Sequence, residues 1–264
     1  MGVSRRTRQR ELKKNVITIM IIAVFAVIVF SINSIGNFIA TKVIQPVVNF
    51  TGTKTDKILT DTLTTPKLTL YLLCAGEMPD MAEAETLKSF TIEQGGGGYI
   101  FNRDDVYYVI HSVFKDKSQA ESKGQQLLDK FTPSVITLTL EETVIKVTGK
   151  SSQMKAVHSC FLKLNNIALT LQNLNEQVET GKISNLEALK ELQKLKNQIE
   201  QSGTELKSLN SSNTKVLAVS DMLVLSETLL NQLPSNDAAD FKQKLNYVTC
   251  AYVCEFYKFY CSLE

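Results

Sequence analysis

The feature that most constrains the fold is an internal repeat: two segments of the sequence match when one is shifted by 36 residues. The first copy is YLLCAGEMPDMAEAE at 71–85, and the second is YYVIHSVFKDKSQAE at 107–121. Each copy opens with apolar residues typical of a strand and passes through a short polar joint. Each then continues as a helix from Asp80 or Ser118, because both residue types favour the N-cap position. A strand–helix unit that occurs twice predicts a sheet covered by two helices.

A further strand follows each predicted helix, YIF at 99–101 and SVITLTL at 134–140. The segment NRDD, 102–105, reads as a four-residue turn between two antiparallel strands. The predicted order for residues 68–145 is therefore β-α-β-β-α-β, the split (ferredoxin-like) arrangement of an α+β domain with both helices on one face of the sheet.

The four consecutive glycines at 95–98 raise the possibility of a phosphate-binding loop. Such a loop needs a strand before its glycines and a Gly-Lys-Ser/Thr sequence that leads into a helix. Here a helix is expected before the run and a strand after it. We interpret the glycines as a joint whose first member ends the helix with a positive φ.

Residues 68–140 resemble the SPOR (sporulation-related repeat) domain in their element order and in several paired positions. These positions are Tyr71 and Leu73 with Tyr107 and Val109, Gly76 with Ser112, and Met78 with Phe114. The resemblance covers about a quarter of the chain. It implies a bacterial module, carried outside the membrane on a single-span anchor, that binds peptidoglycan stripped of its stem peptides at division or sporulation septa.

The family commonly has a polar residue at the fourth position of each strand motif, where this chain has Cys74 and Ile110. Sugar binding needs polar side chains for hydroxyls and an aromatic face for the ring. We therefore take Tyr99, Tyr108 and Ser112 as candidate glycan-binding residues, since Tyr108 and Ser112 share one face of their strand by alternation. The alternative is that these tyrosines are simply half-buried at the sheet edge.

An uncharged segment from Asn15 to Thr41 precedes the repeat. About 20 apolar residues in a helix cross the hydrocarbon core of a bilayer, so we predict one transmembrane helix at 15–41. Six basic residues lie in the tail 1–14 and only Lys42 follows closely, which predicts a cytoplasmic N-terminus. A cleaved signal peptide is the rival reading, but the apolar stretch is longer than a typical signal core and no clear cleavage site follows.

The segment 42–67 is rich in threonine and has no sustained helical pattern. We interpret it as a stalk that holds the following domains off the membrane. The predicted localisation is the cell membrane, with a single pass and with the C-terminal domains outside the cytoplasm.

Helical periodicity dominates residues 150–264. Gly181 ends the first apolar stripe as a C′ residue, and Ser184 with Glu187 forms a capping box for the next helix. That first stripe consists of Leu164, Ile167, Leu171, Leu174 and Val178. Four amphipathic helices with short joints favour an antiparallel bundle over an intermolecular coiled coil.

The last predicted helix places Cys250, Cys254 and Cys261 on one face. Zinc sites usually need four ligands, and only His158 and Cys160 lie in another helix as a possible complement. A disulfide between Cys160 and one of the three is a further possibility outside the cytoplasm. We favour buried cysteines that act as small apolar residues, and we assign no metal and no cofactor. The aromatic residues of AYVCEFYKFYC, 251–261, cap the bundle or contact the sheet domain or a partner.

The overall charge balance excludes one class of partner, because the formal net charge is only +2 and the basic residues concentrate in the N-terminal tail. No broad basic surface for nucleic acid is expected. The two histidines, His111 and His158, suggest no nucleophile–histidine pair, and His111 falls on the packed face of its strand. With no nucleotide loop or nucleophile motif, we expect no enzyme.

Two functions follow from these features. The first is a membrane-anchored envelope protein of a division or sporulation septum that binds peptidoglycan glycan through its SPOR-like domain. The second is a non-catalytic scaffold whose SPOR-like fold and helical bundle recruit another envelope or sporulation protein without binding glycan.

Overall fold

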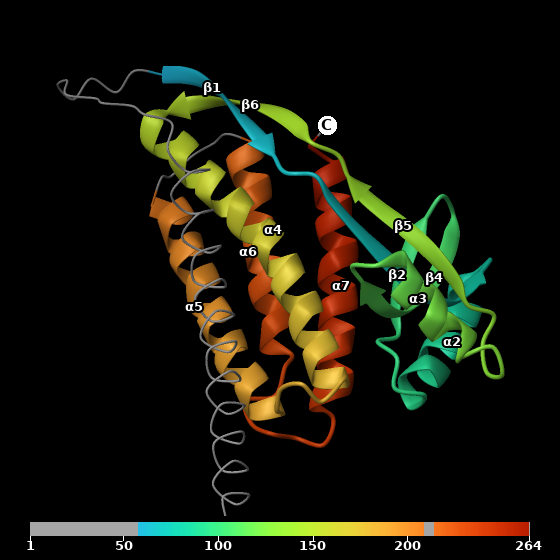
Figure 1. Cartoon of the computed structure of the whole chain (residues 1–264). Helices are drawn as coiled ribbons and strands as arrows, with labels where there is room; N and C mark the ends of the chain where they lie inside the picture. Colours follow the sequence, from blue (N-terminus) through green and yellow to red (C-terminus); the bar gives the residue numbers. More distant parts are fainter. Residues whose placement is uncertain (1–57, 209–213, 264) are drawn as a thin grey trace, which may run out of the picture. The chain divides into compact units, whose positions relative to one another are not determined.

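The computed structural model describes residues 58–208 and 214–263 (Figure 1). Residues 56–264 form one compact unit. The predicted tail and membrane span, 1–41, lie outside the described residues, and within the described part of the chain no helix is both long and apolar enough to cross a membrane.

The elements are β1 (Ile58–Thr65), β2 (Leu68–Met78), α2 (Met81–Glu93), β3 (Tyr99–Arg103), β4 (Val106–Phe114), α3 (Lys117–Gln125), β5 (Ser134–Leu140), β6 (Thr143–Lys150), α4 (Ser151–Glu179), α5 (Asn185–Ser208), α6 (Thr214–Asn231) and α7 (Phe241–Cys261).

The fold is α+β, and its repeat forms a four-stranded antiparallel sheet in the order β3-β4-β2-β5. The predicted order β-α-β-β-α-β is confirmed by β2-α2-β3-β4-α3-β5. Helices α2 and α3 pack on one face of the sheet, over a small core of Leu73, Ala75, Leu127 and Phe131. Asp80 caps α2 as expected, because its side chain accepts a hydrogen bond from the backbone N–H of Glu83 at 2.9 Å.

The turn between β3 and β4 is shorter than predicted, since Asn102 and Arg103 still belong to β3. Only Asp104 and Asp105 form the loop, and both have positive φ angles, of 54° and 59°. Two left-handed residues in a two-residue hairpin make a type I′ turn, which matches the twist of the paired strands. Aspartate tolerates this conformation better than most residues.

The glycine run 95–98 joins α2 to β3, as predicted, and the structure also accounts for its length. Gly95 and Gly98 have φ angles of 84° and 71°, which favour glycine. Gly96 and Gly97 are needed for close packing. A Cβ atom on Gly96 would lie 2.8 Å from the His111 ring, and one on Gly97 would lie 2.7 Å from the sulfur of Cys250 in α7.

The predicted stalk 42–67 is partly strand, because β1 occupies its second half and pairs with β6. One antiparallel register continues from this ribbon into the sheet: Thr65 is opposite Thr143, and Leu68 is opposite Leu140. The ladder breaks at Pro66, which has no N–H to donate. In β1 the buried residues Leu63 and Thr65 alternate with exposed threonines, as expected for a strand with one packed face. This alternation is hard to recognise in the sequence because most of the residues are threonine.

Helices α4 to α7 form the second half, and consecutive helices run in opposite directions (Figure 1). Every residue of the predicted α4 stripe is buried. Gly181 ends α4 with a φ of 67°. The predicted capping box is present, since Glu187 Oε2 accepts from the Ser184 backbone N–H at 2.8 Å and the Glu187 N–H donates to Ser184 Oγ at 3.3 Å.

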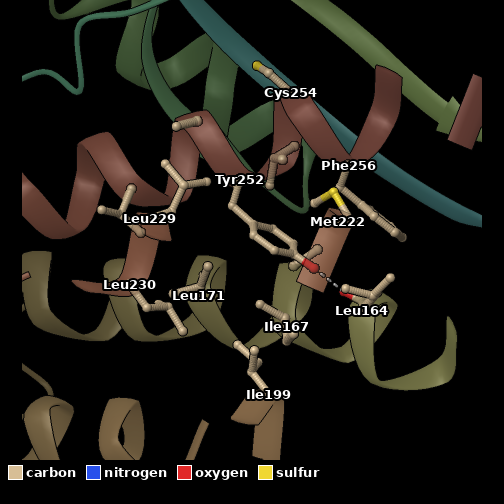
Figure 2. Close-up of a cluster of buried hydrophobic side chains, with 14 of the residues drawn as sticks. Leu164, Ile167, Leu171, Ile199, Met222, Leu229, Leu230, Tyr252, Cys254 and Phe256 are labelled. Carbon is tan, nitrogen blue, oxygen red and sulfur yellow. Dashed lines mark hydrogen bonds between the residues drawn. The ribbon is translucent and has the colours of Figure 1, made fainter. Parts of the chain in front are cut away.

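One large hydrophobic core contains residues of both predicted ranges, 68–145 and 150–264. Helix α7 lies between the sheet and helices α4 and α6 (Figure 1). Figure 2 shows Tyr252 pointing from α7 into the helices, where its hydroxyl donates to the Leu164 carbonyl at 2.8 Å. Cys254 points from α7 toward the strands in the same view.

Candidate functional site

The predicted glycan site lies on the β4 and β3 strands, next to α7. The sheet face opposite α2 and α3 carries buried side chains that belong to the same core as α7, namely Leu70, Leu72, Cys74, Phe101, Ile110 and Leu138. Helix α7 contacts β3, β4 and β5. The apolar residues Cys74 and Ile110 are both fully buried in this core. Apolar residues at these positions favour packing against a helix.

Tyr99 is bonded to α7 rather than presented on an open surface. Its hydroxyl donates a hydrogen bond to the Glu255 carboxylate, and its ring meets Tyr247 edge-on with 6.1 Å between centroids. Burial and the neighbouring Glu255 raise the pKa of Tyr99 above its ordinary value. Lys258 donates to the same carboxylate at 2.8 Å, so Glu255 is held by groups from both β3 and α7.

Ser112 is also enclosed, with only 5% of its surface exposed. Its Oγ lies 2.8 Å from His111 Nδ1 and accepts a hydrogen bond from Asn246 Nδ2 in α7 at 3.4 Å. Tyr108 is half-buried and packs against the main core. Its pKa is raised, mainly by burial and to a smaller extent by the charge of the Glu77 carboxylate. The structure therefore places Tyr99 and Ser112 in the interface with α7.

Asn246 is the centre of a polar cluster that no sequence pattern predicts. It is fully buried, and its Nδ2 donates to the carbonyls of His111 at 3.0 Å and Gly95 at 3.4 Å. Its Oδ1 accepts from Asn175 Nδ2 of α4 at 3.3 Å. Buried polar groups are stable only when they are hydrogen-bonded, so this residue fixes α7 against both β4 and α4. The sequence gives one indication of this role, because Asn246 lies beside the apolar stripe of the last predicted helix.

His111 is packed, as its place on the strand predicts. Its ring contacts Phe131 edge-on, with 6.0 Å between centroids. Burial, and to a smaller extent the charge of Lys123, lowers the pKa of His111 to about 4. The imidazole is therefore neutral at physiological pH.

The cysteines are free thiols, and four of the five are buried. Cys250 and Cys254 belong to the same hydrophobic core as Cys74, whereas Cys261 is exposed at the end of α7. Burial raises the pKa of Cys74 to about 12 and that of Cys160 to about 11. Among the residues that the structure describes, no group of histidine, cysteine and acidic side chains is arranged to hold a metal ion.

No family model matches this chain, and no curated protein and no solved structure is significantly similar to it.

Proposed function

We propose that the protein is a membrane-anchored, non-catalytic scaffold of the bacterial cell envelope, in which a SPOR-like sheet serves as a framework rather than as a glycan-binding surface. One observation carries the proposal: α7 covers the sheet face that bears Leu72, Cys74 and Ile110. A sugar site needs an accessible surface with polar groups that are free to bond. The hydroxyls of Tyr99 and Ser112 are instead bonded to α7.

The SPOR-like part of the proposal is supported by the element order and by the strand order β3-β4-β2-β5. This is the order of a split βαβ fold with two helices on one face. In an open fold of this kind the second face is available to a ligand. Here it is filled by a helix from the same chain.

The membrane anchor in the proposal is supported by the uncharged segment 15–41 and the basic residues before it. Together they favour a cytoplasmic N-terminus and an extracytoplasmic unit after residue 43. A rigid unit held at the outer surface of a membrane is suited to the recruitment of other envelope proteins.

The non-catalytic role is supported by the environment of the residue types that usually carry reactions. His111 is buried with a lowered pKa, and burial raises the pKa of the Cys74 and Cys160 thiols. A useful general base needs a pKa near the working pH and access to substrate, and a reactive cysteine needs a lowered pKa. None of these groups meets those conditions.

A sedimentation assay with purified glycan strands, stripped of their stem peptides, tests the proposal. We expect residues 56–264 to remain in the supernatant, with the same result for a Tyr108→Ala variant. Sedimentation of the unaltered protein would contradict the scaffold proposal. If the Tyr108→Ala variant then failed to sediment with the glycan strands, this would establish the other function, glycan binding through the SPOR-like sheet.

A further inference from the structure

An open groove lies at the end of β2, beside α2 and the connection from α3 into β5. Its volume is about 740 Å³, within the range of ligand-binding clefts. Its lining consists of the last strand residues of β2 (75–78), Leu87 of α2, and the connection from α3 into β5 (128–134). None of the residues of the α7 interface takes part in it.

The floor of the groove is apolar and partly exposed. Leu128 has 57% of its surface exposed, and it lies in the lining with Leu87 and Phe131. Phe90, which is 38% exposed, contacts Phe131 with 5.2 Å between ring centroids. Exposed apolar side chains that gather around one hollow are typical of a binding surface.

One wall of the groove is a strand edge. The pairing of β2 with β5 ends at Cys74 and Ser134, while β2 continues to Met78 and pairs there with β4 alone. Pro133 stands directly before β5 and has no N–H to extend the ladder. In the described part of the chain, no strand pairs with residues 75–78 on the β5 side. Such an edge accepts an added strand from another chain.

The charges on the rim select the kind of strand. Glu77 and Asp129 are exposed carboxylates in the lining, and Glu77 accepts a hydrogen bond from Ser134 Oγ at 2.9 Å. Lys130 is the basic residue of the lining, and its Nζ donates to Gln94 Oε1 at 2.8 Å. The rim therefore has a net negative charge, which favours a partner with lysine or arginine.

We propose that this groove binds an extended segment of a partner protein, in which a lysine or arginine alternates with apolar residues. The segment adds a short strand beside residues 75–78, places apolar side chains against Leu87 and Leu128, and brings its basic side chain to Glu77 and Asp129. The inference deepens the scaffold function proposed above, because it names the surface and the chemistry of the partner. Its test is independent of the glycan assay, so either one can fail alone.

Selection from a phage-displayed library of random peptides, on the purified full chain in detergent, tests the inference. We expect enriched peptides to alternate apolar residues with lysine or arginine. A labelled peptide of the enriched sequence should bind the Glu77→Lys/Asp129→Lys variant at least about tenfold more weakly, because two attractive contacts become repulsive. Leu128→Ser should also weaken binding. A matched charge change on α6, Asp221→Lys/Glu227→Lys, should leave binding unchanged.

Hydrogen exchange of the complex provides the second readout. A peptide that adds a strand should slow amide exchange in residues 75–78, because strand addition forms backbone hydrogen bonds there. The inference is overturned by a selection that enriches no basic–apolar pattern. It is also overturned by equal binding to the Glu77→Lys/Asp129→Lys variant, or by unchanged exchange at 75–78 in the bound state.

Discussion

At the residue scale, Asn246 shows how a single buried polar group fixes two layers of the molecule. It bonds to β4 and the glycine run on one side and to Asn175 of α4 on the other. The sequence predicted the apolar stripe of α7 from local periodicity, since such stripes depend on residues close in the chain. It could not predict the partners of Asn246, because they lie far away in sequence and are set by how the helix packs.

Replacing Asn246 with alanine should reduce the free energy of unfolding by about 1–3 kcal/mol, since the carbonyl of His111 and the side chain of Asn175 lose a buried partner. Urea unfolding followed by circular dichroism measures the change. Asn166→Ala, at an exposed position of the neighbouring helix α4, should change stability by less than about 0.5 kcal/mol. Equal effects in the two variants would show that the buried hydrogen bonds contribute little.

His111 should make stability depend on pH in a defined direction. Its pKa is about 4 in the folded protein against 6.5 for an ordinary histidine, so the unfolded chain binds more protons between these values. The stabilisation is fully present above pH 6.5 and is lost as the pH falls toward 4. The difference amounts to about 3 kcal/mol. A His111→Gln variant should lack this component when urea unfolding is compared at pH 7 and pH 4.5, and an identical pH dependence in both proteins would contradict the assignment.

At the element scale, the repeat and the helical stripes were accessible from sequence because each depends on neighbouring residues. The β1–β6 ribbon could not be predicted in this way, because its paired residues are far apart in the chain. Thr60 and Thr148, whose hydroxyls lie 3.1 Å apart across the ribbon, are 88 residues apart in the chain. A two-stranded ribbon is stable only with packing on one face, and that packing comes from α4 and from the bond between Thr65 and Tyr260 of α7. The threonines of the predicted stalk therefore acquire their strand conformation from distant elements.

The shared register of the ribbon and the sheet predicts the effect of an insertion. One threonine added between Pro66 and Lys67 shifts β1 by one position against β6, which turns Leu63 and Thr65 from the buried face to the exposed face. We expect a loss of about 2–3 kcal/mol from the exposure of Leu63 and faster amide exchange in residues 58–65. The same insertion in the exposed turn at 181–182 should leave exchange in β1 unchanged. Slow exchange in β1 of the first variant would contradict the continuous register.

At the scale of the whole molecule, the sequence suggested two domains, whereas in the structure the sheet and the helices share one large core, beside a smaller core under α2 and α3. The boundary near residue 150 was inferred from the change between strand and helix patterns. Such patterns report the period of an element but not what it packs against. Because α7 belongs to the cores of both the sheet and the helices, the two halves depend on the same helix.

A shared core predicts that the sheet and the helices unfold together. The chain has no tryptophan, so a Phe114→Trp variant reports on the sheet by fluorescence, while far-ultraviolet circular dichroism reports mainly on the helices. Phe114 is partly buried beside the small core under α2 and α3. We expect the two signals to give the same urea midpoint in residues 56–264. A sheet signal that changes at lower urea would indicate two independent domains.

The central claim is that α7 closes the sheet face in the native protein, and the free thiols report on this directly. Cys74, Cys250 and Cys254 lie in the sheet–α7 region, Cys160 lies within the helices, and Cys261 is exposed. Labelling the native protein with a maleimide, followed by mass spectrometry of its peptides, gives a rate for each thiol. We expect Cys261 to react at once and the three interface thiols to react as slowly as Cys160, because only unfolding exposes them. Labelling of Cys74 and Cys254 well ahead of Cys160 would show that α7 leaves the sheet in the native state, and would contradict the account.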